Sequence, residues 1–308
     1  MLYPVDRMRR RCVHGPGRND VTLAVRWAKD EEAVPGYKLG RFLGRGGWGE
    51  VWEATRPDGT PAPLKFLPCD SQVAAAQEIR ALQTVRQLQH PNLIRIEQIW
   101  SITSYIVIGM ELADGSLADL LDVYYTELKQ PIPPDHVCYY LAQAASALDF
   151  LNARQHQLNG QRVAVRHCDV KPSNLLIVGK NVKLADFSLA VQATSSMRNH
   201  RRVGTPNYLA PELLRGILSE RTDQYALAIT YCQLRGGRLP FPDLVTGKVP
   251  RTYSRPAPDL SMLSLAERPI VARALDVVPQ DRWRSCTELI DRLSGCLEKS
   301  PSAAEISV

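Results

Sequence analysis

The chain has 308 residues, of which 44% are hydrophobic, so it can bury a sizeable core and is not a fully disordered protein. Its formal charge of +6 is the balance of 38 basic and 32 acidic residues. The basic residues form no long stripe with interleaved aromatic residues, which argues against a nucleic-acid-binding protein.

Cysteine usage and hydropathy indicate the compartment. Seven scattered cysteines show neither CxxC pairing nor the spacing of zinc ligands, so we expect reduced thiols and a cytoplasmic location. The apolar run nearest the N-terminus, residues 21–25, is too short for a signal core or a membrane span. We therefore expect a soluble chain without a membrane anchor.

The first part of the chain is predicted to be rich in strands. Residues 1–36 mix charged, Gly and Pro residues without periodicity, and we expect a flexible extension there. A compact domain is predicted over residues 37–293. Its first lobe, 37–112, contains one helix over residues 71–89, where apolar residues recur at helical spacing. The predicted strands of this lobe are 37–43, 50–54, 63–67, 93–100 and 104–111.

The second part is predicted to be mainly helical and to form a larger lobe over residues 116–293. A β-rich lobe followed by a helical lobe indicates an α+β fold. Residues 294–308 are predicted to be a C-terminal tail. The predicted helices are 117–128, 134–154, 223–235, 264–276 and 286–293.

A glycine-rich segment lies between the first two predicted strands. Its glycines allow a backbone turn whose amides can approach phosphate oxygens. A Rossmann fingerprint also has this spacing, but it must open a helix, whereas residues 50–54 continue as a strand. A plain hairpin turn is the other alternative. The glycines are Gly44, Gly46, Gly47 and Gly49.

Lys65 lies in the next predicted strand, where a lysine is usually a solvated surface charge. Glu78 is the only acidic residue of the helix predicted over 71–89, and it lies one turn before Leu82 on the apolar side. The two residues are therefore candidates for an ion pair that would hold the ammonium group ready for phosphates.

The most specific pattern runs through the middle of the chain. Within residues 165–188, Asp169, Lys171, Asn174 and Asp186 follow one another at a defined spacing. Each of them alone would be read as a polar residue of a turn or a helix cap. Together they resemble the catalytic loop and magnesium-binding segment of the eukaryotic-like (Hanks-type) serine/threonine protein kinases, most of all the bacterial members.

This resemblance implies a bilobal protein kinase fold and transfer of the ATP γ-phosphoryl group to Ser or Thr hydroxyls of protein substrates. Asp169 would accept the hydroxyl proton, and Lys171 would neutralise charge on the γ-phosphoryl group. Asn174 and Asp186 would ligate Mg²⁺, with Mn²⁺ as an alternative. Lys65 and Glu78 would complete the catalytic set.

The same resemblance implies an adenine pocket and a peptide-docking segment. Thr205 is placed like the threonine that bonds the catalytic Asp and Lys in Ser/Thr kinases. Glu212 and Arg282 are placed like a structural ion pair. Pro63 stands where the family has a small residue against adenine. The pocket residues implied are Val51, Met110, Glu111, Leu112 and Leu176, beside the glycines and Lys65.

Two residues depart from the family pattern. Cys168 replaces the arginine that usually precedes the catalytic Asp and grips a phosphate on the activation segment. Ser188 replaces a glycine, so its backbone loses easy access to positive φ. Candidate autophosphorylation sites, or simply polar loop residues, are Thr194, Ser195 and Ser196.

Two other functions remain open at this stage. A pseudokinase that binds nucleotide and acts as a signalling scaffold would share the fold, although it could lose one or more of the catalytic residues retained here. A nucleic-acid-binding module is disfavoured because no recognition motif is found. The oligomeric state is not predicted.

Overall fold

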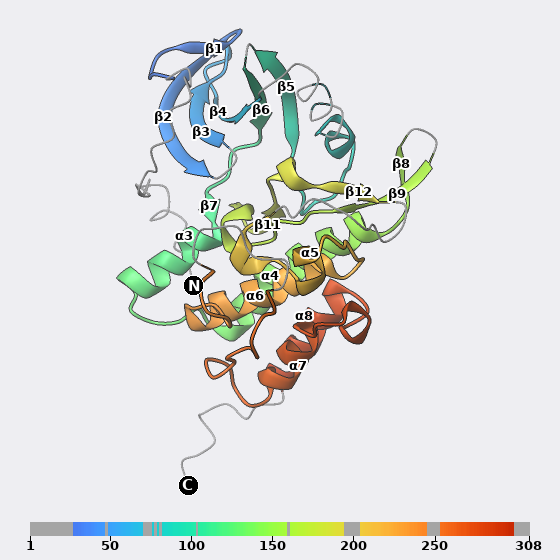
Figure 1. Ribbon diagram of the computed structural model, residues 1–308. Helices are drawn as coiled ribbons and strands as arrows, with labels where there is room; N and C mark the ends of the chain where they lie inside the picture. The colour runs from blue at the N-terminus through green and yellow to red at the C-terminus, as the bar shows by residue number, and fades with distance from the viewer. Residues whose placement is uncertain are drawn as a thin grey trace. The chain divides into compact units, whose positions relative to one another are not determined.

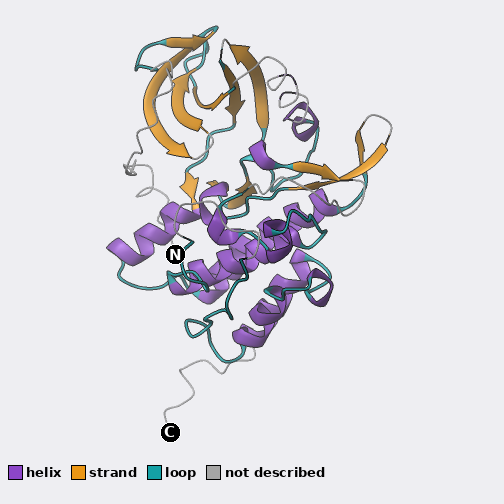
Figure 2. Ribbon diagram, viewed as in Figure 1, coloured by secondary structure: helices purple, strands orange, loops and turns teal. Residues whose placement is uncertain are grey.

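The structure is a computed structural model that describes residues 27–46, 49–69, 76, 79, 82–102, 104–158, 161–193, 204–244 and 253–298. The chain divides into two compact units. The first comprises Met1–Gln89 and Ile94–Asp114, and the second comprises His90–Leu93 and Gly115–Val308. Strands dominate the first unit and helices the second (Figure 2), which confirms the predicted α+β class.

The first unit is built on one antiparallel sheet of six strands in the order β1-β2-β3-β4-β6-β5 (Figure 1). Each of the predicted strands is present, with ends that differ by a few residues. The strands are β1 (Glu32–Val34), β2 (Tyr37–Gly46), β3 (Gly49–Thr55), β4 (Pro61–Pro68), β5 (Ile96–Ile102) and β6 (Tyr105–Met110).

The core of this unit centres on β4, which is paired on both edges, with β3 and β6. Leu64 and Phe66 are fully buried, as is Val107 on the neighbouring strand. Trp27 packs against Phe66 with ring centroids 4.8 Å apart. A strand that is covered on both faces reads as a continuous apolar run rather than an alternating one, and this explains the sequence of β4.

The sheet begins before the boundary expected at Tyr37. Strand β1 lies within the predicted extension 1–36 and pairs with β2, with Val34 opposite Tyr37. Val34 is 2% exposed and belongs to the same core as Phe66. Residues 27–36 are thus part of the unit, because apolar side chains spaced among polar ones still reach the core.

The helix predicted over residues 71–89 is described in part. Residues 76, 79 and 82–86 are helical, and Leu82 and Val85 are buried. Glu78 lies outside the described residues.

The second unit contains the predicted helices. Ser116 caps α3 through a capping box with Asp119, which explains why this helix starts there. Residues Val123–Glu127 continue α3 as a short π-helical turn. The α-helices are α3 (Leu117–Asp122), α4 (Pro134–Asn152), α5 (Pro211–Leu214), α6 (Thr222–Gly236), α7 (Glu267–Ala274) and α8 (Cys286–Glu298).

Two small antiparallel sheets in this unit hold the chemically interesting loops. One has the order β11-β10-β7 and the other β12-β9-β8. The loop 167–174 runs from β9 to β10, and the loop 185–190 runs from β11 to β12. The strands are β7 (Gly115–Ser116), β8 (His156–Leu158), β9 (Gln161–Arg166), β10 (Leu175–Val178), β11 (Asn181–Leu184) and β12 (Val191–Ala193).

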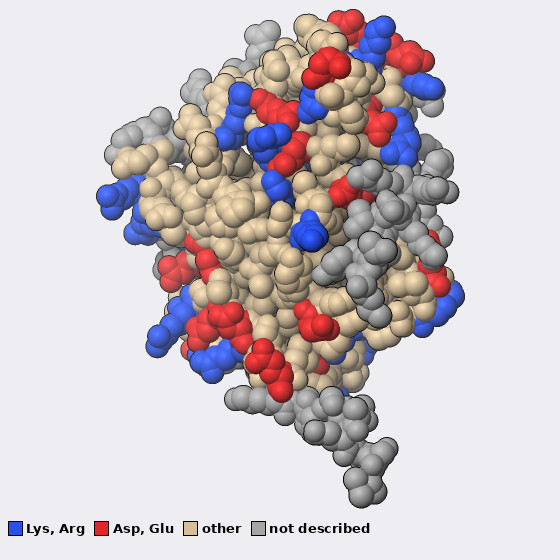
Figure 3. All heavy atoms as spheres, turned by 180° about the vertical axis from the view of Figure 1, so that it is seen from behind, with Lys and Arg blue, Asp and Glu red and all other residues tan. Residues whose placement is uncertain are grey.

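Charges of both signs are mixed on the surface. On the face drawn in Figure 3, Lys and Arg side chains are interspersed with Asp and Glu. Pairs such as Arg41 with Glu53, at 3.2 Å, set opposite charges side by side. None of the helices that the structure describes combines the length and the apolar character needed to cross a membrane.

Candidate active site

The loop after β9 is tied to the first turn of α6. Both carboxylate oxygens of Asp223 accept backbone hydrogen bonds, one from His167 and one from Cys168, each at 2.8 Å. Cys168 has a positive φ of 64°, a conformation that is costly for a residue with a Cβ. Asp223 therefore holds the backbone in the turn that presents the next residue, Asp169.

His167 links the two loops of the site. Its ring is fully buried, with Nε2 2.9 Å from the carbonyl oxygen of Ala185. Its Nδ1 accepts a 3.3 Å hydrogen bond from the backbone amide of Asp169. Since Nδ1 accepts and Nε2 faces an acceptor, the neutral imidazole carries its proton on Nε2. The ring also packs edge-on against Phe187.

Asp169 is 2% exposed and accepts hydrogen bonds at both carboxylate oxygens. Oδ1 accepts from the amide and the hydroxyl of Thr205, at 2.9 and 2.7 Å. Burial opposes ionisation of Asp169, but the Lys171 charge and the hydrogen bonds from Lys171 and Thr205 outweigh it and lower the pKa of the carboxyl. This buried group is thus a carboxylate at neutral pH.

Lys171 lies beside the same carboxylate. Its Nζ is 2.8 Å from Oδ2 of Asp169 and donates a 2.6 Å hydrogen bond to Oγ1 of Thr205. The Thr205 hydroxyl accepts from the lysine and donates to the aspartate, so all three groups are bonded in one chain. The contacts expected of Thr205 are confirmed. The Lys171 side chain is 20% exposed, so the cation can also meet a group that enters from solvent.

Asn174 is oriented by the neighbouring aspartate. Its Nδ2 donates to the carbonyl oxygen and to Oδ2 of Asp169, at 2.8 and 2.9 Å. The backbone carbonyl of Asn174 accepts from the amide of Ala185, which brings the start of the second loop alongside. Because the side-chain nitrogen of Asn174 is bonded to Asp169, the amide oxygen is the atom that could ligate a cation.

Asp186 shows where the strain of the second loop lies. Its φ of 66° is positive, whereas Ser188 sits in the 3₁₀ turn Phe187–Leu189 and has no positive φ. The backbone cost expected at Ser188 is therefore absent there. Instead, the Ser188 hydroxyl donates to Oδ1 of Asp186 at 2.5 Å. The serine fixes one carboxylate oxygen of the candidate metal ligand.

The donor set of Asn174 and Asp186 suits magnesium. One amide oxygen and one carboxylate are hard oxygen ligands, and Mg²⁺ normally keeps the rest of its shell for water and phosphate oxygens. Within the described ranges no group of three or more His, Cys, Asp or Glu residues could hold a metal by itself. A cation held by these two residues would take its remaining ligands from water or phosphate oxygens.

Gly204 brings the segment 204–209 close to the catalytic loop. A Cβ at this position would lie 2.5 Å from the carbonyl oxygen of Cys168, and the φ of Gly204 is +122°. Both the space and the conformation therefore require glycine. The contact joins residues far apart in the chain, so the order of residues alone does not predict it.

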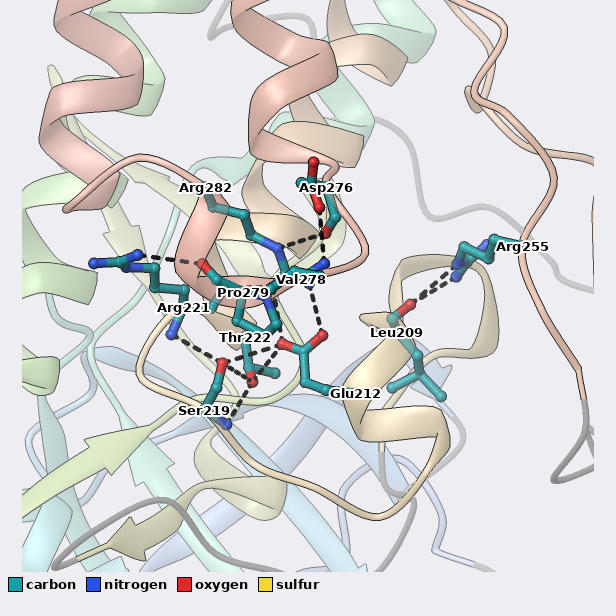
Figure 4. Close-up of polar contacts among 10 residues, drawn as sticks. All are labelled: Leu209, Glu212, Ser219, Arg221, Thr222, Arg255, Asp276, Val278, Pro279 and Arg282. Carbon is teal, nitrogen blue, oxygen red and sulfur yellow. Dashed lines mark hydrogen bonds and ion pairs between the residues drawn. The ribbon is translucent and has the colours of Figure 1, made fainter.

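Glu212 and Arg282 form the expected ion pair at the end of this segment (Figure 4). The guanidinium group donates to both carboxylate oxygens, at 2.8 and 2.7 Å, and its side chain is fully buried. Ser219 and Thr222 each donate a 3.1 Å hydrogen bond to Oε1 of Glu212. Both oxygens of the Glu212 carboxylate are hydrogen-bonded, and the pair joins the end of the segment that starts at Gly204 to the loop before α8.

The glycine-rich hairpin of the first unit joins β2 to β3. Gly44 and Gly46 lie in β2 and Gly49 begins β3, whereas Gly47 lies outside the described residues. A Cβ on Gly49 would lie 2.0 Å from the carbonyl oxygen of Phe66, and its φ is +146°. A Cβ on Gly44 would meet nothing within 4 Å. The fold thus requires glycine at position 49. Among the described residues, no atom fills the space beside Gly44 on the hairpin.

The other predicted nucleotide residues are divided between the units. Lys65 is 8% exposed in β4 and lies opposite Val51. Met110 is the last residue of β6. The Glu111 carboxylate accepts a hydrogen bond from the amide of Arg95 at 2.7 Å, and the Leu112 residue is 41% exposed. Leu176 belongs to the second unit, in β10. The adenine pocket therefore stays a prediction, as does the pairing of Lys65 with Glu78.

Comparison with known proteins gives one consistent answer. A family model described as protein kinase domain matches residues 37–302. Serine/threonine-protein kinase PknF of Mycobacterium tuberculosis is 31% identical over 276 residues, which cover 82% of this chain and 54% of that protein. PknD of the same species is 32% identical over 268 residues, covering 82% and 38%.

A plant protein is similar to the same degree. CBL-interacting protein kinase 4 of Oryza sativa subsp. japonica is 31% identical over 258 residues, covering 80% of this chain and 54% of that protein. The chain thus spans about half the length of PknF and of the rice protein.

Proposed function

Since this chain belongs to the protein kinase family, we propose that it is a serine/threonine kinase that transfers the γ-phosphoryl group of ATP to hydroxyl groups of proteins. The observation that carries the proposal is the bonding of Asp169, a buried carboxylate held between Lys171 and Thr205. An ionised acceptor with fixed geometry is what deprotonation of a substrate hydroxyl requires.

The roles of the side chains follow from their contacts. Asp169 orients the hydroxyl of the substrate and accepts its proton. Lys171 is partly exposed and already bonded to Asp169, so it neutralises charge that develops on the transferred group without reorganising. Thr205 holds both residues in register through its hydroxyl. Positioning of this kind supplies most of the catalysis in phosphoryl transfer.

Magnesium is the metal that we propose for this site, with Mn²⁺ as an alternative. Asn174 and Asp186 would hold it, and it would neutralise the phosphates of ATP. Ser188 restrains the Asp186 carboxylate through its hydroxyl. On the nucleotide side, the proposed ATP-binding residues are the glycine-rich hairpin, Lys65 paired with Glu78, and the predicted adenine pocket.

The departure at Cys168 supports a proposal about activation. Its side chain is buried, and burial together with the charge of Asp223 raises the pKa of the thiol well above its ordinary value. A neutral thiol cannot grip a phosphate as an arginine does. We therefore propose that activity does not require a phosphorylated activation segment. Kinase activity measured after phosphatase treatment tests this, and a large loss of rate would refute it.

Location and substrates are also proposals. The six cysteines within the described ranges are reduced, which supports a cytoplasmic location. Protein substrates with Ser or Thr acceptors fit the docking segment fixed by Glu212.

The decisive experiment is magnesium-dependent transfer of ³²P from labelled ATP to a generic basic protein. We expect transfer by the native chain and none above background by Asp169→Asn, a change that keeps the shape of the side chain. The rival function, a nucleotide-binding scaffold, predicts ATP binding without transfer by either protein. Binding of a fluorescent ATP analogue to both variants separates these outcomes.

A further inference from the structure

Arg255 is a buried cation outside the predicted site. It lies in the irregular segment before α7 and is 9% exposed. Its Nε donates to the carbonyl oxygen of Leu209 at 3.2 Å (Figure 4). Its Nη2 donates to the carbonyl oxygens of Pro206, Asn207 and Leu209, at 2.9, 3.0 and 2.9 Å. One guanidinium group thus binds three carbonyls of a single short turn.

The surroundings of Arg255 do not neutralise its charge with a carboxylate. No ion pair of this residue occurs in the part of the chain that the structure describes. Its guanidinium carbon lies 4.7 Å from the ring centroid of Phe241, which stacks on Tyr225. Burial lowers the pKa of Arg255. A buried unpaired charge is costly, so an apolar side chain would serve better if packing alone were needed.

The turn held by Arg255 directly follows Thr205. Two further contacts anchor it, one to α6 and one to the irregular segment that follows α6. Asn207 donates to the Asp243 carboxylate at 2.9 Å, and the Tyr208 hydroxyl bonds to Gln233 on α6. These two contacts fix the side chains of Asn207 and Tyr208, whereas Arg255 binds the backbone carbonyls of the turn. The path of this backbone determines where Thr205 meets Asp169.

We propose that Arg255 is a positioning residue for phosphoryl transfer. By drawing the carbonyls of residues 206–209 inward, it fixes the Thr205 hydroxyl between Asp169 and Lys171. The inference rests on the proposed kinase function, and it assigns a role in that function to a residue that touches none of the reacting groups.

The test compares Arg255→Met and Arg255→Lys with the native chain. We expect kcat for a protein substrate to fall about tenfold to a hundredfold in Arg255→Met, with the KM for ATP changed less than about twofold. Arg255→Lys should recover part of the loss, because one ammonium group can bind one or two of the three carbonyls. Arg238→Met is the control, since Arg238 forms an exposed pair with Asp259, and it should leave kcat unchanged.

A double-mutant cycle separates positioning from general destabilisation. If Arg255 acts through Thr205, Arg255→Met should lower kcat less than about twofold further in a Thr205→Val background. An equal loss in both backgrounds would overturn the proposal, as would a lowered melting temperature with an unchanged kcat.

Hydrogen exchange tests the inference independently of activity. Arg255→Met should speed amide exchange over residues 204–214 about tenfold and leave the strands β2–β4 unchanged. Unchanged exchange over 204–214 would overturn the inference even if the native chain shows no transfer. Absence of transfer by the native chain would instead refute the proposed function.

Discussion

Asp169 and Glu212 are both buried carboxylates of the second unit that pair with a basic side chain and accept hydrogen bonds from hydroxyl groups. The basic residues that pair with these two carboxylates differ in their exposure to solvent. The Arg282 side chain is fully buried over the ring of Tyr225, and three carbonyl or carboxylate groups occupy its donors. The Lys171 side chain is 20% exposed.

This difference separates a pair that holds the fold from a pair that can act on a ligand. Arg282 has its donors directed at protein groups, so its charge cannot respond to an incoming phosphate. Lys171 is anchored through Asp169 and Thr205 but remains open to solvent. Similar chemistry thus holds the fold at one place and, in the proposed function, serves catalysis at the other, and the variants below test this contrast.

The largest effect is expected for Asp169→Asn. We predict that transfer falls about 10³-fold, since the amide cannot accept the substrate proton, while the melting temperature changes little. Initial rates and a thermal melt measure the two effects. If the variant unfolds instead, Asp169 would belong with Glu212 as a structural group.

Glu212→Ala should act on stability. Leaving the buried guanidinium of Arg282 unpaired should lower the free energy of unfolding by about 3–5 kcal/mol, measured by urea denaturation. The control is Asp259→Ala, which removes an exposed partner of Arg238 and should leave the free energy of unfolding nearly unchanged. Equal losses in the two variants would contradict the contrast.

Gly204→Ala should disturb the close contact between Gly204 and the backbone of Cys168. The new Cβ would lie 2.5 Å from the carbonyl oxygen of Cys168, so we expect Thr205 to shift and kcat to fall about tenfold. Gly179→Ala is the matched control, because its φ of +62° is also positive but its Cβ would meet nothing within 4 Å. A similar loss of kcat in both variants would show that backbone strain alone is responsible.

The smallest effect concerns pH. Because the folded-state pKa of Asp169 is lowered, its stabilisation is present above the pKa of the unfolded carboxyl, about 3.9, and is lost as pH falls through the lower folded value. Lys171→Met removes the main favourable charge and should raise that pKa. Carboxyl-carbon NMR titration of both proteins measures it, and an unchanged pKa would mean that the hydrogen bonds from Thr205 and Asn174 keep Asp169 ionised without the lysine.

Much of the fold was accessible from the sequence. The helices 134–154 and 223–235 were predicted within two residues at each end. The helix predicted over 286–293 continues to Glu298, so residues 294–298 belong to α8 and not to the predicted tail. Apolar residues at helical spacing indicated α4 and α8, whereas α6 is buried on nearly every side. The segment 27–36 was misjudged, since only three of its residues form a strand and their partner lies in β2. Short edge strands carry too few residues for a periodic signal.

The residue types of the site were also accessible, whereas their bonding was not. The order of Asp169, Lys171, Asn174 and Asp186 along the chain sufficed to predict their chemistry. It could not reveal that Asp223 accepts from the two amides before Asp169, or that the Ser188 hydroxyl donates to Asp186. These contacts depend on backbone conformation, which a list of side chains does not define.

The sequence by itself determined the α+β class and the resemblance to protein kinases, and it predicted Asp169 as the proton acceptor, because these depend on local periodicity and on spacing within one segment. Only the tertiary structure decided that Gly204 must pass over Cys168, that the expected pair of Glu212 and Arg282 is buried, and that Arg255 holds the turn after Thr205. The partners in these contacts lie 36 to 70 residues apart in the chain. Packing of the helical unit brings them together.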